Sequence, residues 1–282
     1  MVETAILYDA TRCTACRGCQ VACKQWNEND EVIPVVQNGV KAVCRGSYEN
    51  PPDLSPQTWL KMEFREVEQG GKVDWLFTRR SCMHCTDAGC IKVCPNGSLY
   101  HHESGFVAYN KDTCTGCGYC IDACPFNVPR SDRNLITGIA KMDKCTLCTT
   151  PGLDRITQGW EPSCVKTCPT DSLIYGDRAV LMSEGKKRVS SLTAKGYSSS
   201  SLYGDKELGG LHVMYVLANS PEFYGLPVDP QISAATIAWQ NIIQPLGLAV
   251  GGLTILGLGL NYLVARQAKL TRELPPKDKE EE

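Results

Sequence analysis

One stretch of the chain decides its fold: Cys114-Thr115-Gly116-Cys117-Gly118-Tyr119-Cys120-Ile121-Asp122-Ala123-Cys124-Pro125. Its cysteines are spaced C-x2-C-x2-C-x3-C-P. Three thiolates at this spacing can surround one face of a [4Fe–4S] cluster, whereas the fourth points to a different cluster. Pro125 ends the short helix that carries the fourth cysteine, because proline has no N–H and clashes with the preceding turn. One block of this kind therefore predicts at least one partner block.

Three further blocks supply the partners. The first block is Cys13, Cys16, Cys19 and Cys23, the second is Cys82, Cys85, Cys90 and Cys94, and the fourth is Cys145, Cys148, Cys164 and Cys168. The first has the same spacing, the second has a wider middle gap, and the fourth has a fifteen-residue gap between its second and third cysteines. The blocks contain sixteen of the 17 cysteines. Four blocks of four predict four [4Fe–4S] clusters.

Zinc and disulfides are the competing uses of so many cysteines. Structural zinc takes its ligands from two separated pairs, not from four cysteines within eleven residues. The two-residue loops of the C-x2-C spacings are too tight for a strain-free disulfide framework. The remaining cysteine, Cys44, is expected to be a free or buried thiol outside the clusters, because the other sixteen already supply every ligand.

Short apolar runs flank the blocks. Residues 6–9 and 105–110 lead into the first and third blocks, and residues 97–100 and 171–175 follow the second and fourth. These runs have the composition of strands. Strand, cluster loop, short helix and strand form a ferredoxin unit. At 282 residues the chain can hold two such two-cluster units, stapled by their clusters in place of a large aliphatic core.

Loop length predicts which blocks share clusters. Only nineteen residues separate the second block from the third, the length of one ferredoxin connection, so these two should exchange their fourth cysteines. The first and fourth blocks are left to pair around them. The predicted ligand sets are Cys13, Cys16, Cys19 and Cys168 (cluster 1); Cys145, Cys148, Cys164 and Cys23 (cluster 2); Cys82, Cys85, Cys90 and Cys124 (cluster 3); and Cys114, Cys117, Cys120 and Cys94 (cluster 4).

The predicted fold is α+β, with two nested bacterial-ferredoxin-like two-[4Fe–4S] units, an inserted β-hairpin region and a single C-terminal transmembrane helix. The predicted segments are an outer unit of residues 1–81 and 140–180 with an insertion at 25–81, an inner unit at 82–139, a subunit-contact extension at 181–231, a membrane anchor at 232–266 and a charged cytoplasmic tail at 267–282. Within the insertion, residues 58–64 and 73–77 are β-like runs joined through Gly70 and Gly71, which predicts a hairpin that covers the clusters.

The extension shows three local patterns. Residues 178–196 predict an amphipathic helix ended by a glycine, residues 198–210 a loop, and residues 212–217 a strand. Its His212, like His84, His101 and His102, is a possible haem ligand. With only four histidines in the chain and none on an evident pair of helices, we interpret all four as structural.

Charge points to no polyanionic partner, since the net charge is −2, and we expect no nucleic acid. Lysine and arginine are instead placed beside the cysteines, at Arg12, Arg17, Lys24, Arg79, Arg80, Lys92, Lys111, Lys144 and Lys166. A cluster held by four thiolates is anionic, so nearby cations should ease its reduction. A solvated surface charge is the alternative interpretation for any one of them.

The C-terminal part predicts a membrane anchor. No charged residue occurs from Pro230 to Ala265, and the part from Pro245 onwards is almost wholly apolar and long enough to span a bilayer. Its many glycines leave room for a partner helix. Arg266, Lys269 and Arg272 follow at once, which predicts a cytoplasmic C-terminus and a cluster-bearing body outside the cytoplasm. Residues 1–10 contain no signal peptide, so export would need a partner with a twin-arginine signal.

Taken together, the four blocks, the anchor and three motifs resemble the iron–sulfur β subunit of membrane-bound respiratory formate dehydrogenases, of the nitrate-inducible and aerobic types. The motifs are residues 161–169 (EPSCVKTCP), 210–217 (GLHVMYVL) and 224–227 (YGLP). The resemblance covers nearly the whole chain. It implies an electron-transfer subunit between a catalytic molybdopterin (Mo or W) α subunit, which oxidises formate, and a haem b membrane γ subunit that reduces quinone.

The resemblance also implies an order. The cluster on Cys13, Cys16 and Cys19 would face the α subunit, followed by the Cys145 and Cys82 clusters, with the Cys114 cluster nearest the membrane. An iron–sulfur subunit of another molybdopterin oxidoreductase or of a membrane-bound hydrogenase is the alternative within the same class. A standalone enzyme or a cluster-based redox sensor would need an acid–base pair, an open coordination position or a DNA-reading module, and the sequence shows none of these.

Overall fold

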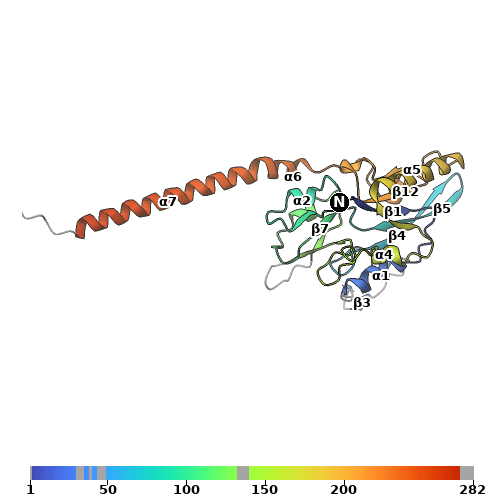
Figure 1. The fold of residues 1–282 in the computed structure, drawn as a ribbon, viewed down its shortest axis with the longest axis horizontal. Helices are drawn as coiled ribbons and strands as arrows, with labels where there is room; N and C mark the ends of the chain where they lie inside the picture. Colours follow the sequence, from blue (N-terminus) through green and yellow to red (C-terminus); the bar gives the residue numbers. More distant parts are fainter. Residues whose placement is uncertain (1, 30–34, 38–39, 43–48, 132–139, 274–282) are drawn as a thin grey trace, which may run out of the picture. The chain divides into compact units, whose positions relative to one another are not determined.

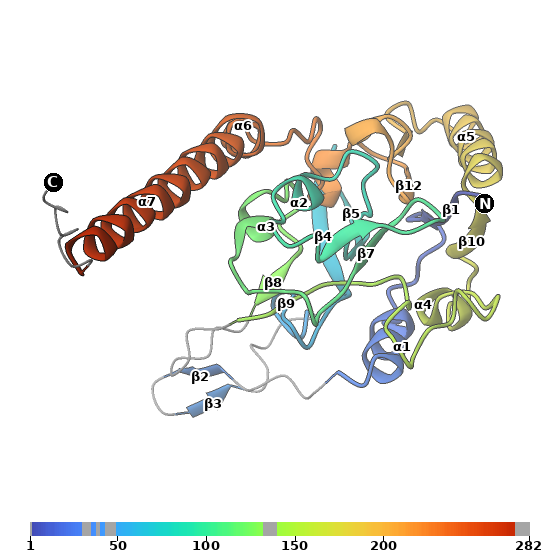
Figure 2. The ribbon, with the colours of Figure 1, turned by 60° about the vertical axis from the view of Figure 1, so that its left-hand side comes forward.

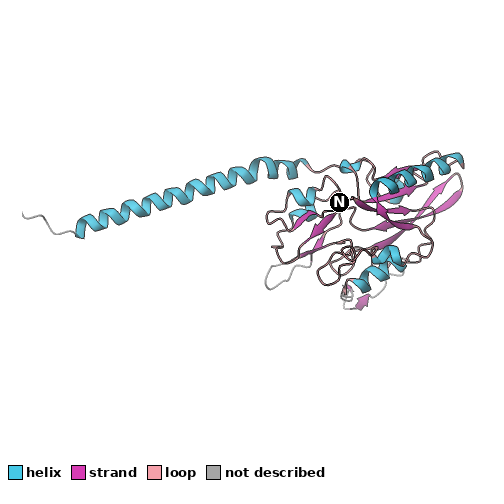
Figure 3. Ribbon diagram, viewed as in Figure 1, coloured by secondary structure: helices cyan, strands magenta, loops and turns pink. Residues whose placement is uncertain are grey.

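The computed structural model describes residues 2–29, 35–37, 40–42, 49–131 and 140–273. The chain divides into two compact units, residues 1–233 and 234–282, which are described separately. Figures 1 and 3 show the elements of the first unit. In chain order these are β1 (Thr4–Asp9), α1 (Gly18–Trp26), β2 (Val35–Gln37), β3 (Val40–Ala42), β4 (Lys61–Gln69), β5 (Lys72–Arg80), α2 (Gly89–Lys92), β6 (Leu99–His101), β7 (Val107–Tyr109), α3 (Tyr119–Asp122), β8 (Arg130–Ser131), β9 (Met142–Asp143), α4 (Ser163–Lys166), β10 (Leu173–Asp177), α5 (Arg178–Ala194), β11 (Ser201–Tyr203), η1 (Glu207–Gly209), β12 (Val213–Leu217) and η2 (Pro221–Tyr224).

A four-stranded sheet in the order β10-β1-β12-β11 organises the first unit. Its strand β1 runs antiparallel to β10 and parallel to β12, so that Tyr8 lies opposite Leu173 on one side and Tyr215 on the other. The strand that leads into the first cysteine block therefore pairs with the strand that follows the fourth. This pairing brings the two ends of the cluster-bearing sequence together.

Both faces of the sheet are covered. Ile6, Tyr8 and Tyr215 point into the core that also contains the buried cysteines, whereas Leu7 and Met214 pack in a second cluster with residues of α5. The run Val-Met-Tyr-Val-Leu of β12 is apolar at every position and buried at every position, as expected for a strand with both faces covered. Asp177 caps α5, since its carboxylate accepts hydrogen bonds from the N–H groups of Ala179 and Val180.

Four short helices each carry the third cysteine of one block. They are α1 with Cys19, α2 with Cys90, α3 with Cys120 and α4 with Cys164. Helix α1 contacts α4, and α2 contacts α3 (Figure 2). The first block is thus packed with the fourth, and the flanking strands β1 and β10 are paired in the same way. The second block is packed with the third, and their flanking strands β6 and β7 are also paired.

The predicted hairpin is formed by the two longest described strands, with residues 61–64 of the first predicted run in β4 and residues 73–77 in β5. Strands β4 and β5 are antiparallel from Lys61 opposite Arg80 to Gln69 opposite Lys72. Gly70 and Gly71 form the turn with φ of 59° and 77°, a conformation that glycine adopts without steric penalty. The hairpin ends directly before Cys82, so β5 delivers the chain to the second block.

Two sequence-based expectations are wrong. The short helix of the third block ends at Asp122 and does not carry the fourth cysteine, Cys124. Residues 198–210, expected to be loop, contain the edge strand β11, in which Tyr203 lies opposite Tyr215 of β12. The serine-rich run before Leu202 has no alternating pattern of its own, and the strand forms because β12 offers it an open edge and two covered faces. Strand propensity is overridden here by tertiary pairing.

The second unit is helical. It consists of α6 (Ala234–Ala238), the π-helical segment η3 (Trp239–Ile243) and α7 (Gln244–Glu273). Within α7, Gln244–Lys269 is long and apolar enough to cross a membrane. Its 26 residues correspond to about 39 Å of helix, which exceeds the roughly 30 Å of a hydrocarbon core. The predicted anchor at 232–266 covers α6, η3 and most of α7.

Gly105 lies where the β6–β7 hairpin closely approaches His212 next to β12. It has φ of +90°, and a Cβ there would lie 2.4 Å from His212 Cε1. Gly97 also has positive φ, at +63°, but a Cβ there meets nothing within 4 Å. We expect Gly97→Ala to lower the free energy of unfolding by about 1–2 kcal/mol through backbone strain alone. Gly105→Ala should lose roughly 1–3 kcal/mol more, because the methyl group overpacks against the ring.

The measurement is the denaturation midpoint of both purified variants beside the wild type. Equal losses for the two alanine substitutions would show that the approach of His212 to Gly105 contributes nothing.

Candidate metal-cluster sites

The sixteen cysteines of the four blocks are all free of disulfides in the structure. We keep the four predicted ligand sets as groups, here called quartets. Quartet one is Cys13, Cys16, Cys19 and Cys168; quartet two is Cys23, Cys145, Cys148 and Cys164; quartet three is Cys82, Cys85, Cys90 and Cys124; quartet four is Cys94, Cys114, Cys117 and Cys120. One cavity is lined by all of quartet one and another by all of quartet four. Electrostatic contacts connect the members of the other two quartets. Cys44 lies outside the described residues.

Each block contains a residue in the left-handed conformation two positions after its first cysteine. These residues are Ala15, His84, Gly116 and Leu147, with φ of 52°, 50°, 72° and 56°. Only one of the four is glycine, so three of these loops hold a side chain in a conformation that costs about 1–2 kcal/mol. At Gly116 the glycine is required for a second reason, because a Cβ would lie 2.5 Å from the Ala140 carbonyl oxygen.

The left-handed residue turns its main-chain N–H toward the first sulfur of the block. Ala15 N lies 3.3 Å from Cys13 Sγ, and Leu147 N lies 3.5 Å from Cys145 Sγ. The N–H groups of His84 and Gly116 make the same contact with Cys82 and Cys114. Hydrogen bonds of this kind favour a charged sulfur over a protonated one. The four left-handed residues therefore share one local role, the stabilisation of a thiolate.

Burial acts in the opposite direction on the cysteine side chains, because it favours the protonated thiol over the thiolate. It raises the pKa of Cys23 well above its ordinary value and raises the pKa of Cys148 to about 11. A group bound by these sulfurs as thiolates must therefore displace protons from them. Neighbouring thiolates would repel one another, so the quartets are arranged for a cationic metal core that balances their charge.

Two fully buried cations lie among the quartets. Arg79 is 0% exposed, and its Nη2 donates to Cys164 Sγ at 3.6 Å. Lys144 is 1% exposed, and its Nζ donates to the carbonyl oxygens of Val107 and Cys145, both at 2.9 Å. Within the described residues, neither cation forms an ion pair with a carboxylate. A buried cation without an anion is destabilising by several kcal/mol, so both side chains require negative charge nearby.

A buried hydroxyl points to the same requirement. Tyr109 lines the cavity of quartet four, where its hydroxyl faces Cys114 of that quartet and has no nitrogen or oxygen partner among the described residues. Its counterpart in the first block, Tyr8, also stands five residues before the first cysteine, but its hydroxyl donates to the Phe77 carbonyl at 2.8 Å. An acceptor inside the quartet-four cavity would satisfy Tyr109.

These observations fit [4Fe–4S] clusters. A cluster held by four thiolates is anionic and carries sulfur acceptors, which the buried cations and the Tyr109 hydroxyl both need. Among the described residues, no three His, Cys, Asp or Glu side chains are arranged to hold a single metal ion. In quartets one and four the cysteines instead surround a cavity, the geometry that a polynuclear group requires.

The four histidines make contacts with the main chain. His84 is fully buried, and burial lowers its pKa well below the ordinary value, so its ring is neutral. Three of the rings place Nδ1 beside a carbonyl oxygen: His84 beside Val107 at 3.0 Å, His101 beside Gly105 at 3.0 Å and His212 beside Thr4 at 2.7 Å. The fourth, His102, stacks on Phe106. These contacts give each ring a structural role.

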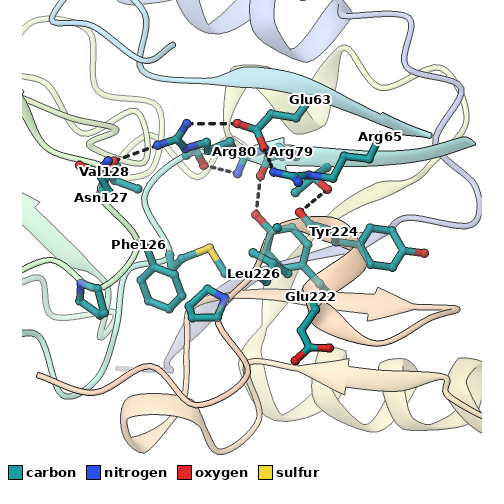
Figure 4. A pocket seen from close by; sticks show the side chains of 17 residues that line it. Glu63, Arg65, Arg79, Arg80, Phe126, Asn127, Val128, Glu222, Tyr224 and Leu226 are labelled. Atoms are coloured by element: carbon teal, nitrogen blue, oxygen red, sulfur yellow. Dashed lines mark hydrogen bonds and ion pairs between the residues drawn. The ribbon is translucent and has the colours of Figure 1, made fainter. Parts of the chain in front are cut away.

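A cavity of about 600 Å³ opens beside the second block (Figure 4). Arg80 spans it, donating to Glu63 at 3.1 Å and to the Asn127 carbonyl at 3.2 Å. Arg65 also pairs with Glu63, at 3.3 Å. Both arginines of the wall that reach solvent are thus held by Glu63 within the hairpin, and the hydrogen bond from Arg80 to the Asn127 carbonyl ties the hairpin to residues 125–128.

Comparisons with known proteins agree with the cysteine chemistry. Two family models, each described as a 4Fe-4S dicluster domain, match residues 12–98 and 73–178. The chain is 42% identical over 266 residues to the "Formate dehydrogenase, nitrate-inducible, iron-sulfur subunit" of Escherichia coli, covering 93% of this chain and 85% of that protein. It is 41% identical over 259 residues to the "Formate dehydrogenase iron-sulfur subunit" of Haemophilus influenzae, covering 90% and 78%.

The chain belongs to the family of formate dehydrogenase iron–sulfur subunits. Like its relatives, this iron–sulfur subunit is a non-catalytic electron-transfer component of an enzyme complex, with two dicluster domains and four [4Fe–4S] clusters. A more distant relative is the "Hydrogenase-2 operon protein HybA" of Escherichia coli O157:H7, 30% identical over 291 residues, with 89% of this chain and 83% of that protein covered.

Sequence reasoning found the sulfurs of the iron–sulfur subunit but not the groups that support them. Arg79 and Lys144 stood among nine cations near cysteines, and nothing in the sequence separated these two buried side chains from exposed Lys166. The four left-handed residues could not be predicted either, since only Gly116 is a glycine, the residue type that favours this conformation.

Iron content tests the quartets. The anaerobically purified iron–sulfur subunit should contain about 16 iron and 16 sulfide per chain, four of each per cluster. Cys148→Ala removes one ligand of quartet two and should reduce iron to about 12. Cys44→Ser, which leaves all quartets intact, should keep the wild-type content. Spectroscopy that found zinc in place of iron, or an iron loss in Cys44→Ser equal to that in Cys148→Ala, would contradict the assignment.

Proposed function

We propose that this subunit relays electrons from a catalytic molybdopterin (Mo or W) α subunit that oxidises formate to a haem b-containing membrane γ subunit, and from there to quinone. The family membership supports the role of relay, and the four quartets supply the path. In this proposal quartets one to four bind the four clusters with the cysteines that define them. Each cluster, when bound, accepts and passes on one electron.

The exposure of the cysteines supports the two ends of the path, and the direction follows the order implied by the resemblance to respiratory formate dehydrogenases. Cys16 in quartet one and Cys117 in quartet four are the two exposed cysteines among the sixteen described. All four cysteines of quartet two are buried, and quartet three contains no exposed one. A relay needs an accessible quartet at each end and insulated quartets between. We place the α subunit at quartet one and the γ subunit at quartet four.

The chain's own residues support each transfer in simple ways. The N–H groups of the left-handed residues donate to the first sulfur of each block, and Tyr109 can donate into quartet four. The aliphatic and aromatic core around Tyr8, Phe106 and Tyr215 excludes water from the interior quartets. A dry environment limits the reorganisation of solvent when charge moves, and it prevents side reactions with oxygen or protons.

The anchor sets the proposed topology. Helix α7 crosses the membrane once, with Arg266 and Lys269 on the cytoplasmic side and the cluster-bearing unit on the opposite side. Residues 267–282 are the cytoplasmic tail, and the subunit is exported with a partner that carries a twin-arginine signal. Within the first unit, the outer ferredoxin-like unit (1–81 and 140–180) encloses the inner one (82–139). Residues 181–231 contact the other subunits.

A hydrogenase complex is the second candidate setting. The relative named as a hydrogenase-2 operon protein is 30% identical over 89% of this chain, which supports a hydrogenase complex as the alternative. The native complex distinguishes the two settings. Quinone reduction driven by formate supports the proposal, whereas quinone reduction by hydrogen and not by formate supports the alternative.

Cys117→Ala tests the serial relay. Removal of this ligand should destroy the quartet-four cluster and reduce formate-dependent quinone reduction to background, because the last step before the membrane is lost. Reduction of an artificial dye by the α subunit should persist. Cys44→Ser is the matched control, with both activities unchanged. Quinone reduction that survived in Cys117→Ala would exclude a single obligatory path.

A truncation tests the anchor. Deletion of residues 244–282 should release a soluble complex of the α subunit with this subunit that still reduces an artificial dye with formate. Deletion of residues 274–282 alone keeps the candidate span and should leave the complex in the membrane fraction. Both fractions can be followed by sedimentation and immunoblotting. If the longer deletion stayed membrane-attached without the γ subunit, the span would not be the anchor.

A further inference from the structure

Arg79 has the most unusual environment of any cation in the described chain. Its guanidinium donates to Cys164 Sγ and to the Ser81 hydroxyl, and its buried Nε has no partner. Its charge acts on Cys164 and Cys145 of quartet two and on Cys19 of quartet one. It also acts on Cys82, the first ligand of quartet three. One permanent charge is thus shared by sulfurs from three quartets.

The strand that carries Arg79 is held in place from three sides. The Tyr8 hydroxyl donates to the Phe77 carbonyl at 2.8 Å, and the Tyr215 hydroxyl donates to the carbonyl of Arg79 itself at 2.5 Å. The Thr78 hydroxyl donates to the Tyr224 carbonyl at 2.9 Å. These bonds tie β5 to β1, β12 and η2. These bonds fix the main chain at Arg79, and the guanidinium itself is held by its hydrogen bonds to the Ser81 hydroxyl and Cys164 Sγ.

The other buried cation is placed differently. Lys144 donates to two main-chain carbonyl oxygens and to no sulfur. Arg80, the next residue of β5, lies on the opposite face of the strand, where it pairs with Glu63 and Asp53. Its side chain is 25% exposed. Arg79 is the buried cation that combines a fixed position, a hydrogen bond to a quartet sulfur and no competing carboxylate in the described part of the chain.

Reduction of a cluster adds one negative charge. A buried positive charge beside it stabilises the reduced state more than the oxidised state, and the low dielectric of the interior enlarges the effect. A hydrogen bond to the ligating sulfur acts in the same direction, since hydrogen bonds to the sulfurs are among the factors that set cluster potentials. Guanidinium remains charged at every accessible pH, so the effect does not switch off.

We propose that Arg79 is a positioning residue that raises the reduction potential of the quartet-two cluster, making the transfer from quartet one to quartet two favourable. The direction of electron transfer rests on the proposed function, but the effect of Arg79 on the reduction potential does not depend on that function. The sulfur contact lies in quartet two, so the shift is largest there. Quartet one, reached by charge alone, shifts less.

Potentiometric titration followed by electron paramagnetic resonance tests this in the complete complex, with dithionite and mediator dyes and no formate. In Arg79→Gln, the midpoint potential of the quartet-two cluster should fall. At a fixed potential, the ratio of reduced to oxidised cluster should then be at least tenfold lower than in the wild type. For a one-electron couple this is 59 mV. The quartet-two signal is identified as the one altered in Cys148→Ala. Arg79→Lys keeps the charge but loses the planar fork and should lie between the wild type and Arg79→Gln.

Arg80→Gln is the matched control on the same strand and should leave all four midpoints unchanged. An unshifted quartet-two midpoint in an iron-replete Arg79→Gln complex overturns the proposal, as does an equal shift in Arg80→Gln. If Arg79→Gln does not retain iron, Arg79→Lys decides, and a midpoint equal to the wild type refutes the role. Formate-to-quinone turnover is recorded separately, so a complex that fails with formate but shows the shift refutes only the proposed function.

Discussion

Concentrated negative charge inside a small protein body is the constraint on which this structure depends. The sixteen sulfurs of the quartets lie within residues 1–233, and quartet two is wholly buried. Taking charge out of water is destabilising unless opposite charge and hydrogen bonds meet it. Iron meets most of it in the loaded protein. Arg79, Lys144 and the N–H groups of the four left-handed residues meet the remainder, and all of them lie on the segments that also supply the ligands.

The same constraint explains the repeated design of the cysteine blocks. Each block contains a left-handed residue that aims an N–H at the first sulfur and a short helix that carries the third cysteine. The left-handed turn and the helix are local features, yet each quartet takes its fourth cysteine from another block. Local geometry thus prepares three ligands, and tertiary pairing of β1 with β10 and of β6 with β7 brings the fourth.

Much of this organisation could be predicted from the sequence, because cysteine spacing is a chemical requirement rather than a propensity. The spacings located all sixteen sulfurs, and the apolar runs located β1, β7, β10 and β12 within two residues. Edge strand β11 was missed because its serines carry no strand pattern and its order comes from β12. The left-handed φ of Ala15, His84 and Leu147 could not be predicted, because these residue types carry no signal for that conformation. Cluster geometry imposes it on residue types that do not favour it.

The placement of β1 has a consequence for how the protein is made. Its first strand leaves the ribosome early, yet its two partners in the sheet, β10 and β12, lie at Leu173–Asp177 and Val213–Leu217. At ordinary rates of translation the nascent chain waits roughly 10 to 30 seconds for β10 alone. During that interval the first thiols cannot be enclosed. A cell that makes this protein therefore has to shield its N-terminal cysteines from oxidants and stray metals until the last strands have been synthesised.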